Sequence, residues 1–258
     1  MSYPNVKLSK ENHVAVITID HQPANALNQT TLKSLGEALD DLASDDQVKA
    51  VVLTGEGRFF IAGADIKEFT ELDEQKAVAV SEVGQQLFNR METFSKPIIA
   101  AINGACLGGG LELAMACHIR YAAPEAKMGL PELNLGIMPG YGGTQRLPLL
   151  VGRGKATELI LTSQLIDGEE AFKIGLVDAL FPVEQVVEEA KKLANKISEK
   201  SAISVKLSLD AIHHGLLHGV EAGYKQEAKL FGQVFTTEDR KEGVAAFIEK
   251  RKPNFTNR

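Results

Sequence analysis

The chain has 258 residues, of which 44% are hydrophobic and 24% are charged, and this composition excludes a mainly disordered protein. Lys and Arg number 28 against 34 Asp and Glu, so the net charge of −6 offers no broad surface for nucleic acid. The two cysteines form neither a disulfide framework nor a CxxC metal motif. With no apolar run of about 18 residues and no secretory signal pattern, we expect a cytoplasmic protein without a membrane partner.

The first part of the chain predicts alternating strands and helices. The apolar, β-branched run Val14–Ile19 predicts a strand. Four leucines between residues 32 and 42 share one face of a helix, and Val48–Leu53 predicts a second buried strand. After a glycine-bearing segment, apolar residues between 80 and 94 form another helical stripe, and Ile98–Ile102 predicts a third strand.

The remaining elements become increasingly helical. A helix and two short strands are predicted at Leu111–Cys117, Ile119–Ala122 and Ala126–Met128. From about Gly143 onward helices dominate, and Ile203–Phe247 contains no convincing strand. We therefore predict an α/β core over residues 1–200 and a helical region over residues 201–258.

Two motifs that suggest cofactors each lack a residue that the cofactor site requires. The glycine run LGGGLEL opens a predicted helix, but a dinucleotide site needs a third glycine where Leu113 stands. His214 and His218 are four residues apart, and without an acidic third ligand in an evident motif they read as surface or interface histidines. We therefore expect neither a dinucleotide nor a metal ion.

Two glycine-rich segments offer exposed backbone N–H groups. The bend IAGADIKEF (61–69) leaves its main chain uncovered and is able to hold an oxygen, although alone it reads as a plain surface turn. In NGACLGGGLELAM (103–115), Gly108–Gly110 open a helix whose N-terminus favours negative charge. Glu112 in its first turn could simply complement the helix dipole, but that does not explain the glycines beside it.

A third segment, MGLPELNLGIMPGYGGTQRL (128–147), adds a second carboxylate. Glu132 lies behind a proline in an apolar stretch, where Leu130, Leu133 and Leu135 are expected to desolvate it. Taken alone, it reads equally well as an exposed loop carboxylate. Together, the two donor segments and two carboxylates suit enolate chemistry on a thioester.

At these residues the sequence resembles the enoyl-CoA hydratase (crotonase) family, and in particular its short-chain enoyl-CoA hydratases. The resemblance covers essentially the whole chain from Val14 to the basic tail EKRKPNF. Its main motifs are AGADIKEF (62–69), PIIAAINGACLGGGLELAMAC (97–117), MGLPELNLGIMPGYGGTQRL (128–147) and GEEAFKIGLVD (168–178).

The resemblance implies a fold and an active site. The fold is expected to be a crotonase-type spiral of ββα units, with C-terminal helices that form trimers and two trimers stacked into a homo-hexamer. The N–H groups of Ala64 and Gly109 are expected to form an oxyanion hole. Glu112 matches the glutamate that activates water, and Glu132 matches the glutamate that protonates the α-carbon.

The resemblance also implies where the substrate binds. Ala62, Asp65 and Ile66 are expected along the path of coenzyme A, and the N–H of Gly140 is expected to help position the site. No metal or redox cofactor is needed, since coenzyme A is part of the substrate. Because its phosphates require cations, Lys67 and the cluster Lys250–Lys252 are further candidates.

The expected reaction is syn addition of water to trans-2-enoyl-CoA, which gives 3-hydroxyacyl-CoA in fatty-acid or amino-acid breakdown. The alternatives are an enoyl-CoA isomerase and a hydratase of a specialised branched acyl-CoA. A non-catalytic acyl-CoA or RNA-binding relative is disfavoured by the acidic charge and the carboxylate pair. Packing between subunits is predicted from six apolar residues of the C-terminal region: Leu207, Ile212, Leu216, Val220, Leu230 and Phe231.

Overall fold

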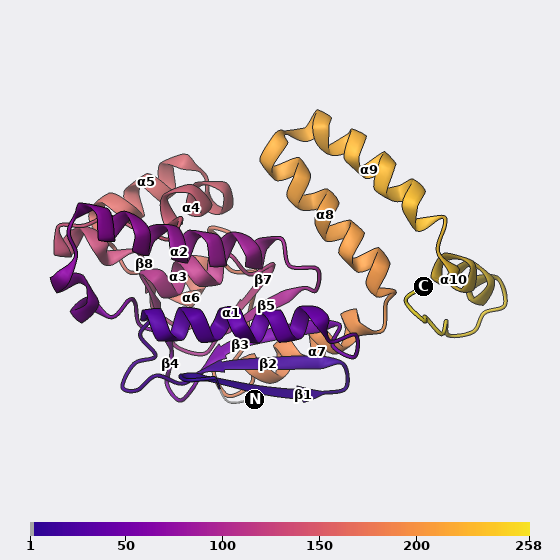
Figure 1. Cartoon of the computed structure of the whole chain (residues 1–258), viewed down its shortest axis with the longest axis horizontal. Coiled ribbons are helices and arrows are strands. Elements are labelled where there is room, and N and C mark those ends of the chain that lie inside the picture. Colours follow the sequence, from indigo (N-terminus) through magenta and orange to yellow (C-terminus); the bar gives the residue numbers. More distant parts are fainter. Residues whose placement is uncertain (1–2) are drawn as a thin grey trace.

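A six-stranded sheet begins with an antiparallel hairpin of β1 (Val6–Glu11) and β2 (Val14–Ile19) (Figure 1). The computed structural model describes residues 3–258. The hairpin turn, Asn12 and His13, has positive φ at both residues, which matches a two-residue connection. The strand order is β1-β2-β3-β5-β7-β9, and every neighbouring pair after the hairpin is parallel.

The chain passes alternately between this sheet and a parallel three-stranded sheet of order β4-β6-β8. The remaining strands are β3 (Ala50–Gly55), β4 (Phe59–Ile61), β5 (Ile98–Ile102), β6 (Ala105–Leu107), β7 (Ile119–Ala122), β8 (Met128–Gly129) and β9 (Ala179–Leu180). Each step from β3 to β4, β5 to β6 and β7 to β8 crosses from the first sheet to the second. This alternation is the predicted spiral, and the α/β prediction is confirmed.

Helices connect and cover the sheets. They are α1 (Gln29–Ser44), α2 (Glu74–Glu92), α3 (Gly109–Met115), α4 (Gly143–Val151), α5 (Arg153–Thr162), α6 (Gly168–Lys173), α7 (Val186–Ser198), α8 (Ala202–His218), α9 (Val220–Val234) and α10 (Glu238–Ile248), with short 3₁₀ helices η1 (Ile66–Glu71) and η2 (Pro131–Leu135). Side-chain caps at Asn28, Asp73 and Asp167 begin α1, α2 and α6. Within residues 3–258, no helix combines the length and apolar character needed to cross a bilayer.

Strand β3 shows how the core divides between two faces. All six of its residues are buried, and successive side chains point to opposite faces. Val51 and Leu53 join the main core, which includes side chains of α1, α2 and α3. Ala50 and Val52 pack with Ala190 of α7 on the other face. The sheet is therefore covered on both sides, and α3 is embedded deeply in the main core.

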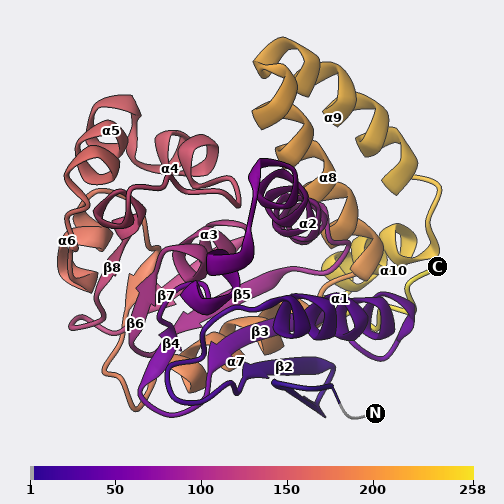
Figure 2. The ribbon, with the colours of Figure 1, turned by 60° about the vertical axis from the view of Figure 1, so that its left-hand side comes forward.

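The C-terminal region differs from this body. Helices α8 and α9 form a hairpin that projects away from the sheets, and α10 lies near its base, at the end opposite the turn between α8 and α9 (Figures 1 and 2). None of the residues of α8 is buried. The boundary predicted at residue 200 falls between α7 and α8, and the helical C-terminal region is confirmed. Its status as a separate unit stays a prediction.

Several local predictions need correction. Strands β1, β6 and β9 were not predicted, and β9 interrupts the stretch after Gly143 that was expected to be dominated by helices. Helix α3 begins two residues before the predicted Leu111 and ends at Met115. The strand predicted at Ala126–Met128 is instead Met128–Gly129. Short strands depend on a distant partner for their bounds, which local apolar runs do not reveal.

Candidate active site

The three motifs meet around one cavity of about 490 Å³. Its walls come from η1, α2, the N-terminus of α3 and the segment from Pro131 to Tyr141. Most of the predicted site residues line it: Ala62, Ala64, Ile66, Gly109, Glu112, Glu132 and Gly140. Asp65 and Lys67 are not among its lining residues. The spiral fold thus brings together residues that lie up to 78 positions apart, from Ala62 to Gly140.

One side of the cavity is main chain that leaves N–H groups unpaired. Leu27 N donates to Gly63 O at 2.8 Å, and Asp65 N donates to Leu27 O at 2.7 Å. Because this pairing is strand-like, the N–H of Ala64 points away from Leu27. Gly109 is the first residue of α3, so its N–H has no acceptor within the helix. Among the described residues neither N–H donates an internal hydrogen bond, and both residues line the cavity.

Each of the three consecutive glycines, Gly108 to Gly110, is required at its position for a different reason. Gly108 has φ +51°, and a Cβ there would lie 3.0 Å from Glu132 Oε1. A Cβ at Gly109 would lie 3.3 Å from the Tyr141 ring. A Cβ at Gly110 would lie 2.3 Å from the carbonyl oxygen of Ile61, which is backbone and has little freedom to move. Gly110 is therefore needed for packing α3 against β4.

Glu112 is a buried carboxylate with a fixed orientation. Its side chain lies in the first turn of α3 and only 2% of the residue is exposed. Oε1 accepts hydrogen bonds from Tyr141 N at 2.8 Å and Gly143 N at 2.7 Å. Burial raises the pKa of Glu112 to about 7, helped by the negative charge of Glu132 and opposed by the two N–H donors. The helix-dipole interpretation does not account for these contacts.

Glu132 is held less firmly. Burial raises the pKa of its carboxyl group, and Oε2 is buried without a hydrogen-bond partner in the described part of the chain. Leu130, expected to desolvate it, is fully buried, whereas Leu135 is 57% exposed. The Glu132 carboxyl group is therefore desolvated as predicted, but Leu135 is largely exposed and is not one of the buried residues around it.

Tyr141 was not predicted, yet it organises the site. Its ring lies between Gly84 of α2 and Gly109 of α3, where a Cβ would come within 2.2 Å and 3.3 Å of it. The ring of Phe88 meets it edge-on with centroids 5.7 Å apart. Its own N–H binds Glu112, so the packed ring fixes a hydrogen-bond donor. The sequence signal was the run GYGG, whose glycines indicate a tight turn.

Gly140 lines the cavity, and the expected role of its N–H in positioning the site stays a prediction. Its carbonyl accepts hydrogen bonds from Ser81 Oγ and, at 2.9 Å, from Gln85 Nε2. These contacts tie the turn to α2. The N–H groups that orient Glu112 belong to the residues that follow, Tyr141 and Gly143.

The predicted polar and basic residues are mostly engaged elsewhere. Asp65 Oδ1 accepts from Lys67 N at 3.1 Å and so caps η1. Arg251 pairs with Glu242 at 2.6 Å and with Glu249, and Lys252 pairs with Glu199 at 3.1 Å. This basic cluster follows α10, and α10 lies apart from α3, whose N-terminus lines the cavity (Figures 1 and 2). The assignment of this cluster to the coenzyme A phosphates stays a prediction, although Arg251 and Lys252 already pair with carboxylates.

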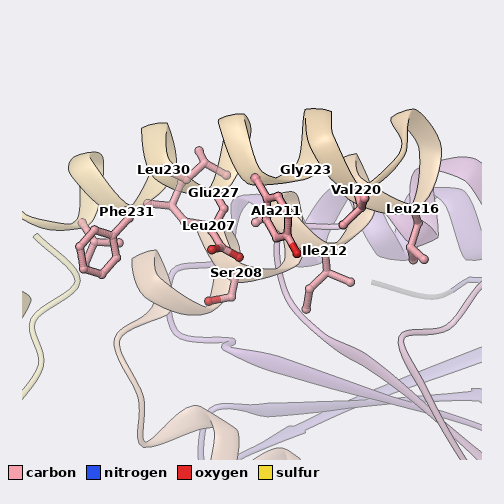
Figure 3. A pocket seen from close by; sticks show the side chains of 13 residues that line it. Leu207, Ser208, Ala211, Ile212, Leu216, Val220, Gly223, Glu227, Leu230 and Phe231 are labelled. Atoms are coloured by element: carbon pink, nitrogen blue, oxygen red, sulfur yellow. The ribbon is translucent and has the colours of Figure 1, made fainter.

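A second cavity, of about 560 Å³, lies along the α8–α9 hairpin and has a different character (Figure 3). Figure 3 shows Leu207, Ile212 and Leu216 of α8 together with Val220 and Phe231 of α9 at this groove. The lining is mostly apolar and Glu227 is its one carboxylate, so the groove lacks the carboxylate pair of the first cavity.

No residues suited to a metal ion accompany either cavity. The rings of His214 and His218 are 4.5 Å apart on α8. Across residues 3–258, no group of three or more His, Cys, Asp or Glu side chains is arranged to bind a metal. The two histidines therefore lack the third ligand that a typical protein site requires.

Residues 9–258 match a family model described as Enoyl-CoA hydratase/isomerase. The chain belongs to this family. It is 52% identical to a probable enoyl-CoA hydratase of Bacillus subtilis, over 97% of this chain and 98% of that protein. It is 46% identical to the short-chain-enoyl-CoA hydratase of Clostridium acetobutylicum, over the full length of both.

Solved structures of the enoyl-CoA hydratase/isomerase family agree with the fold. The crystal structure of an enoyl-CoA hydratase from Bacillus anthracis superposes with a TM-score of 0.94 at 38% identity. The match covers 98% of this chain and 100% of that one. The fold predicted by the resemblance is therefore confirmed over nearly the whole chain.

Proposed function

We propose that this protein is an enoyl-CoA hydratase, a hydro-lyase that adds water in a syn manner to trans-2-enoyl-CoA and forms 3-hydroxyacyl-CoA. The observation that carries the proposal is the pairing of Glu112 and Glu132 in one cavity beside the unpaired N–H groups of Ala64 and Gly109. Close relatives named as hydratases support the same reaction. The pathway would be fatty-acid or amino-acid breakdown in the cytoplasm.

The thioester oxygen would bind to the N–H groups of Ala64 and Gly109. Negative charge develops on this oxygen as water adds to the β-carbon. Preorganised donors of this kind stabilise such a transition state by about 2.7–4 kcal/mol each. The reacting carbons would then lie between the two carboxyl groups.

The two carboxyl groups are held differently. Burial raises the pKa of both, but Glu112 is bound by two N–H donors and lies near the positive charge of Arg146, which favour its ionised form. Glu132 instead has a buried oxygen without a partner in the described part of the chain. Glu112 would take a proton from water as the water oxygen bonds to the β-carbon. Glu132 would give a proton to the α-carbon, and exchange with solvent would restore both groups.

An enoyl-CoA isomerase is the second candidate. Glu132 has a buried oxygen without a partner, and a single carboxylate suffices to move a proton between the α- and γ-carbons. Glu112 is a second carboxylate held in a fixed orientation, and its presence favours hydration. A hydratase of a branched acyl-CoA would share the same pair, and a panel of acyl chains distinguishes it.

Coenzyme A would run along the 62–67 loop. Ala62 and Ile66 line the cavity, and Ile66 is 47% exposed at its edge. Asp65 supports the loop by capping η1, and Lys67 is an exposed cation beside it. Replacing Lys67 with Ala should raise KM more than it lowers kcat. The proposed reaction requires neither metal nor redox cofactor.

The C-terminal helices would assemble a homo-hexamer built as a dimer of trimers. Ile212, Leu216 and Phe231 are 62%, 67% and 64% exposed, which is unusual for a contiguous apolar surface on a monomer. Burying them between subunits would remove this surface from water.

Hydration of crotonyl-CoA tests the proposed function directly. In buffer with EDTA and without NAD, the enoyl ultraviolet absorbance should fall on addition of enzyme and the product should be 3-hydroxybutyryl-CoA. Loss of activity in EDTA with recovery on adding a divalent metal would contradict a metal-free reaction. Isomerisation of a 3-enoyl-CoA without any hydration would favour the second candidate.

A further inference from the structure

Arg146 is a buried cation whose hydrogen bonds the proposed chemistry leaves unexplained. It lies in α4, and only 8% of its side chain is exposed. Nη2 donates to Glu92 Oε2 and to Asn89 Oδ1 of α2, both at 2.7 Å. Nη1 donates to the carbonyl oxygen of Tyr141 at 2.8 Å. Nη1 and Nη2 thus join α2 to the turn beside Glu112, which offsets part of the cost of burying a guanidinium, while Nε is buried without a hydrogen-bond partner in the described part of the chain.

The guanidinium of Arg146 packs against the turn of residues 141–143. A Cβ at Gly142 would lie 2.2 Å from Nη1 of Arg146, so the arginine occupies the space where a side chain would otherwise lie. Gly142 has φ +104°, a conformation that glycine adopts freely and could also leave freely. The residues on either side of it, Tyr141 and Gly143, supply both N–H groups that bind Glu112 Oε1.

We propose that Arg146 is a positioning residue that, anchored by Asn89 and Glu92, holds the 141–143 turn so that Glu112 keeps one oxygen bound and presents the other to water. This inference rests on the proposed function of Glu112. Arg146 binds the carbonyl oxygen of Tyr141, and the N–H of Tyr141 binds Glu112, so these hydrogen bonds act on the orientation of the carboxylate and not on the substrate itself.

The charges around Glu112 give the inference a second readout. Glu132 faces it from η2 and raises its pKa, Arg146 faces it from α4 and lowers it, and the phenol of Tyr141 lies beside it. Removing the positive charge of Arg146 should raise the pKa of Glu112. Since the ionised carboxylate is the base, the acidic limb of the kcat/KM profile should move to higher pH.

Variants Arg146→Met and Arg146→Lys test the role. Both should lower kcat at least about tenfold while changing KM little, because neither keeps the planar fork that joins α2 to the turn. Only the methionine variant should shift the acidic limb, since lysine retains the charge. Arg90→Met, which removes another arginine–carboxylate pair of α2 at 2.6 Å, is the matched control and should leave kcat unchanged.

A double variant separates positioning from stability. Arg146→Met leaves Glu92 without its partner, whereas Arg146→Met with Glu92→Gln removes both charges. We expect the double variant to recover Tm but not kcat. Recovery of kcat together with Tm, or wild-type kcat in both single variants, would overturn the inference.

An infrared titration separates this inference from the proposed function. The carboxyl band of Glu112, assigned by its loss in Glu112→Gln, should titrate at higher pH in Arg146→Met than in the wild type. An unchanged titration would overturn the inference even if the enzyme hydrates crotonyl-CoA. If the wild type does not hydrate crotonyl-CoA, the proposed function fails, while the titration still reports on Arg146.

Discussion

The body of the molecule and its C-terminal helices use apolar residues in opposite ways. In α3 every residue is buried, including Glu112, whereas in α8 none is. The body buries its side chains against its own strands and helices, and this packing fixes the carboxylates. The α8–α9 hairpin leaves Leu216 67% exposed. An apolar helical face therefore indicates that a partner surface is needed, without indicating which chain supplies it.

The largest expected effect lies in the body and should leave the helices unaffected. Glu112→Gln and Glu132→Gln preserve shape but remove proton transfer, so each should lower kcat by about 10²–10⁴-fold with KM much less changed. The double variant should be little worse than either single one. Steady-state hydration measures this effect, and Glu158→Gln on the exposed face of α5 is the control.

Deuterium incorporation separates the two glutamates. Glu112→Gln should still exchange a proton of a bound thioester through Glu132, and Glu132→Gln should not. Equal exchange in both variants would keep the pair but discard this division of roles. Full hydration activity in either variant would remove that residue from the mechanism.

The converse prediction concerns the helices alone. Leu216→Glu places a charge on the exposed face of α8 and should reduce the assembly to smaller species, while the sheets of the body stay folded. Light scattering measures the mass, and far-ultraviolet circular dichroism monitors the fold. Val183→Glu, at an apolar position of the body that is 51% exposed, should not change the mass. A wild-type protein that is a stable monomer at micromolar concentration would contradict the prediction.

Two glycine substitutions test how tightly the body is packed. Gly110→Ala drives a methyl group into the Ile61 carbonyl and should destabilise the fold by about 1–3 kcal/mol. Gly154→Ala in α5 meets no atom within 4 Å and should be neutral or stabilise by about 0.4–1 kcal/mol. Urea unfolding measures both free energies of unfolding. Equal effects of the two substitutions would show that the close contact between Gly110 and Ile61 does not contribute to stability.

A further prediction concerns the pH dependence of stability. The pKa of Glu112 rises from an ordinary value of 4.5 to about 7 on folding, so the native state binds more protons than the unfolded state between these values. The free energy of unfolding contributed by this group should therefore fall as pH rises from 4.5 to about 7, and then level off. Subtracting the curve of Glu112→Gln isolates it. A rising difference over this range would contradict the sign.

The sequence predicted what depends on local pattern. Apolar runs located β2, β5 and β7, and the glycine and carboxylate motifs located most of the cavity lining. It did not reveal β6 or β9, whose few residues become strands only by pairing with distant ones. Tyr141 escaped notice because its contribution is a main-chain N–H held by ring packing. The pattern of the tail also did not show that Arg251 pairs with Glu242, which lies nine residues earlier in α10.

The contact between Gly84 and Tyr141 has a consequence for how these two positions evolve. A methyl group at position 84 would lie 2.2 Å from the tyrosine ring, so the two positions share one volume between α2 and α3. A substitution of a larger residue at position 84 would disrupt the site unless a smaller residue had first replaced Tyr141. Because position 141 also aims Glu112, such exchanges should be rare and should occur as coupled changes. Homologous sequences should therefore show covariation between these positions, which are 57 residues apart.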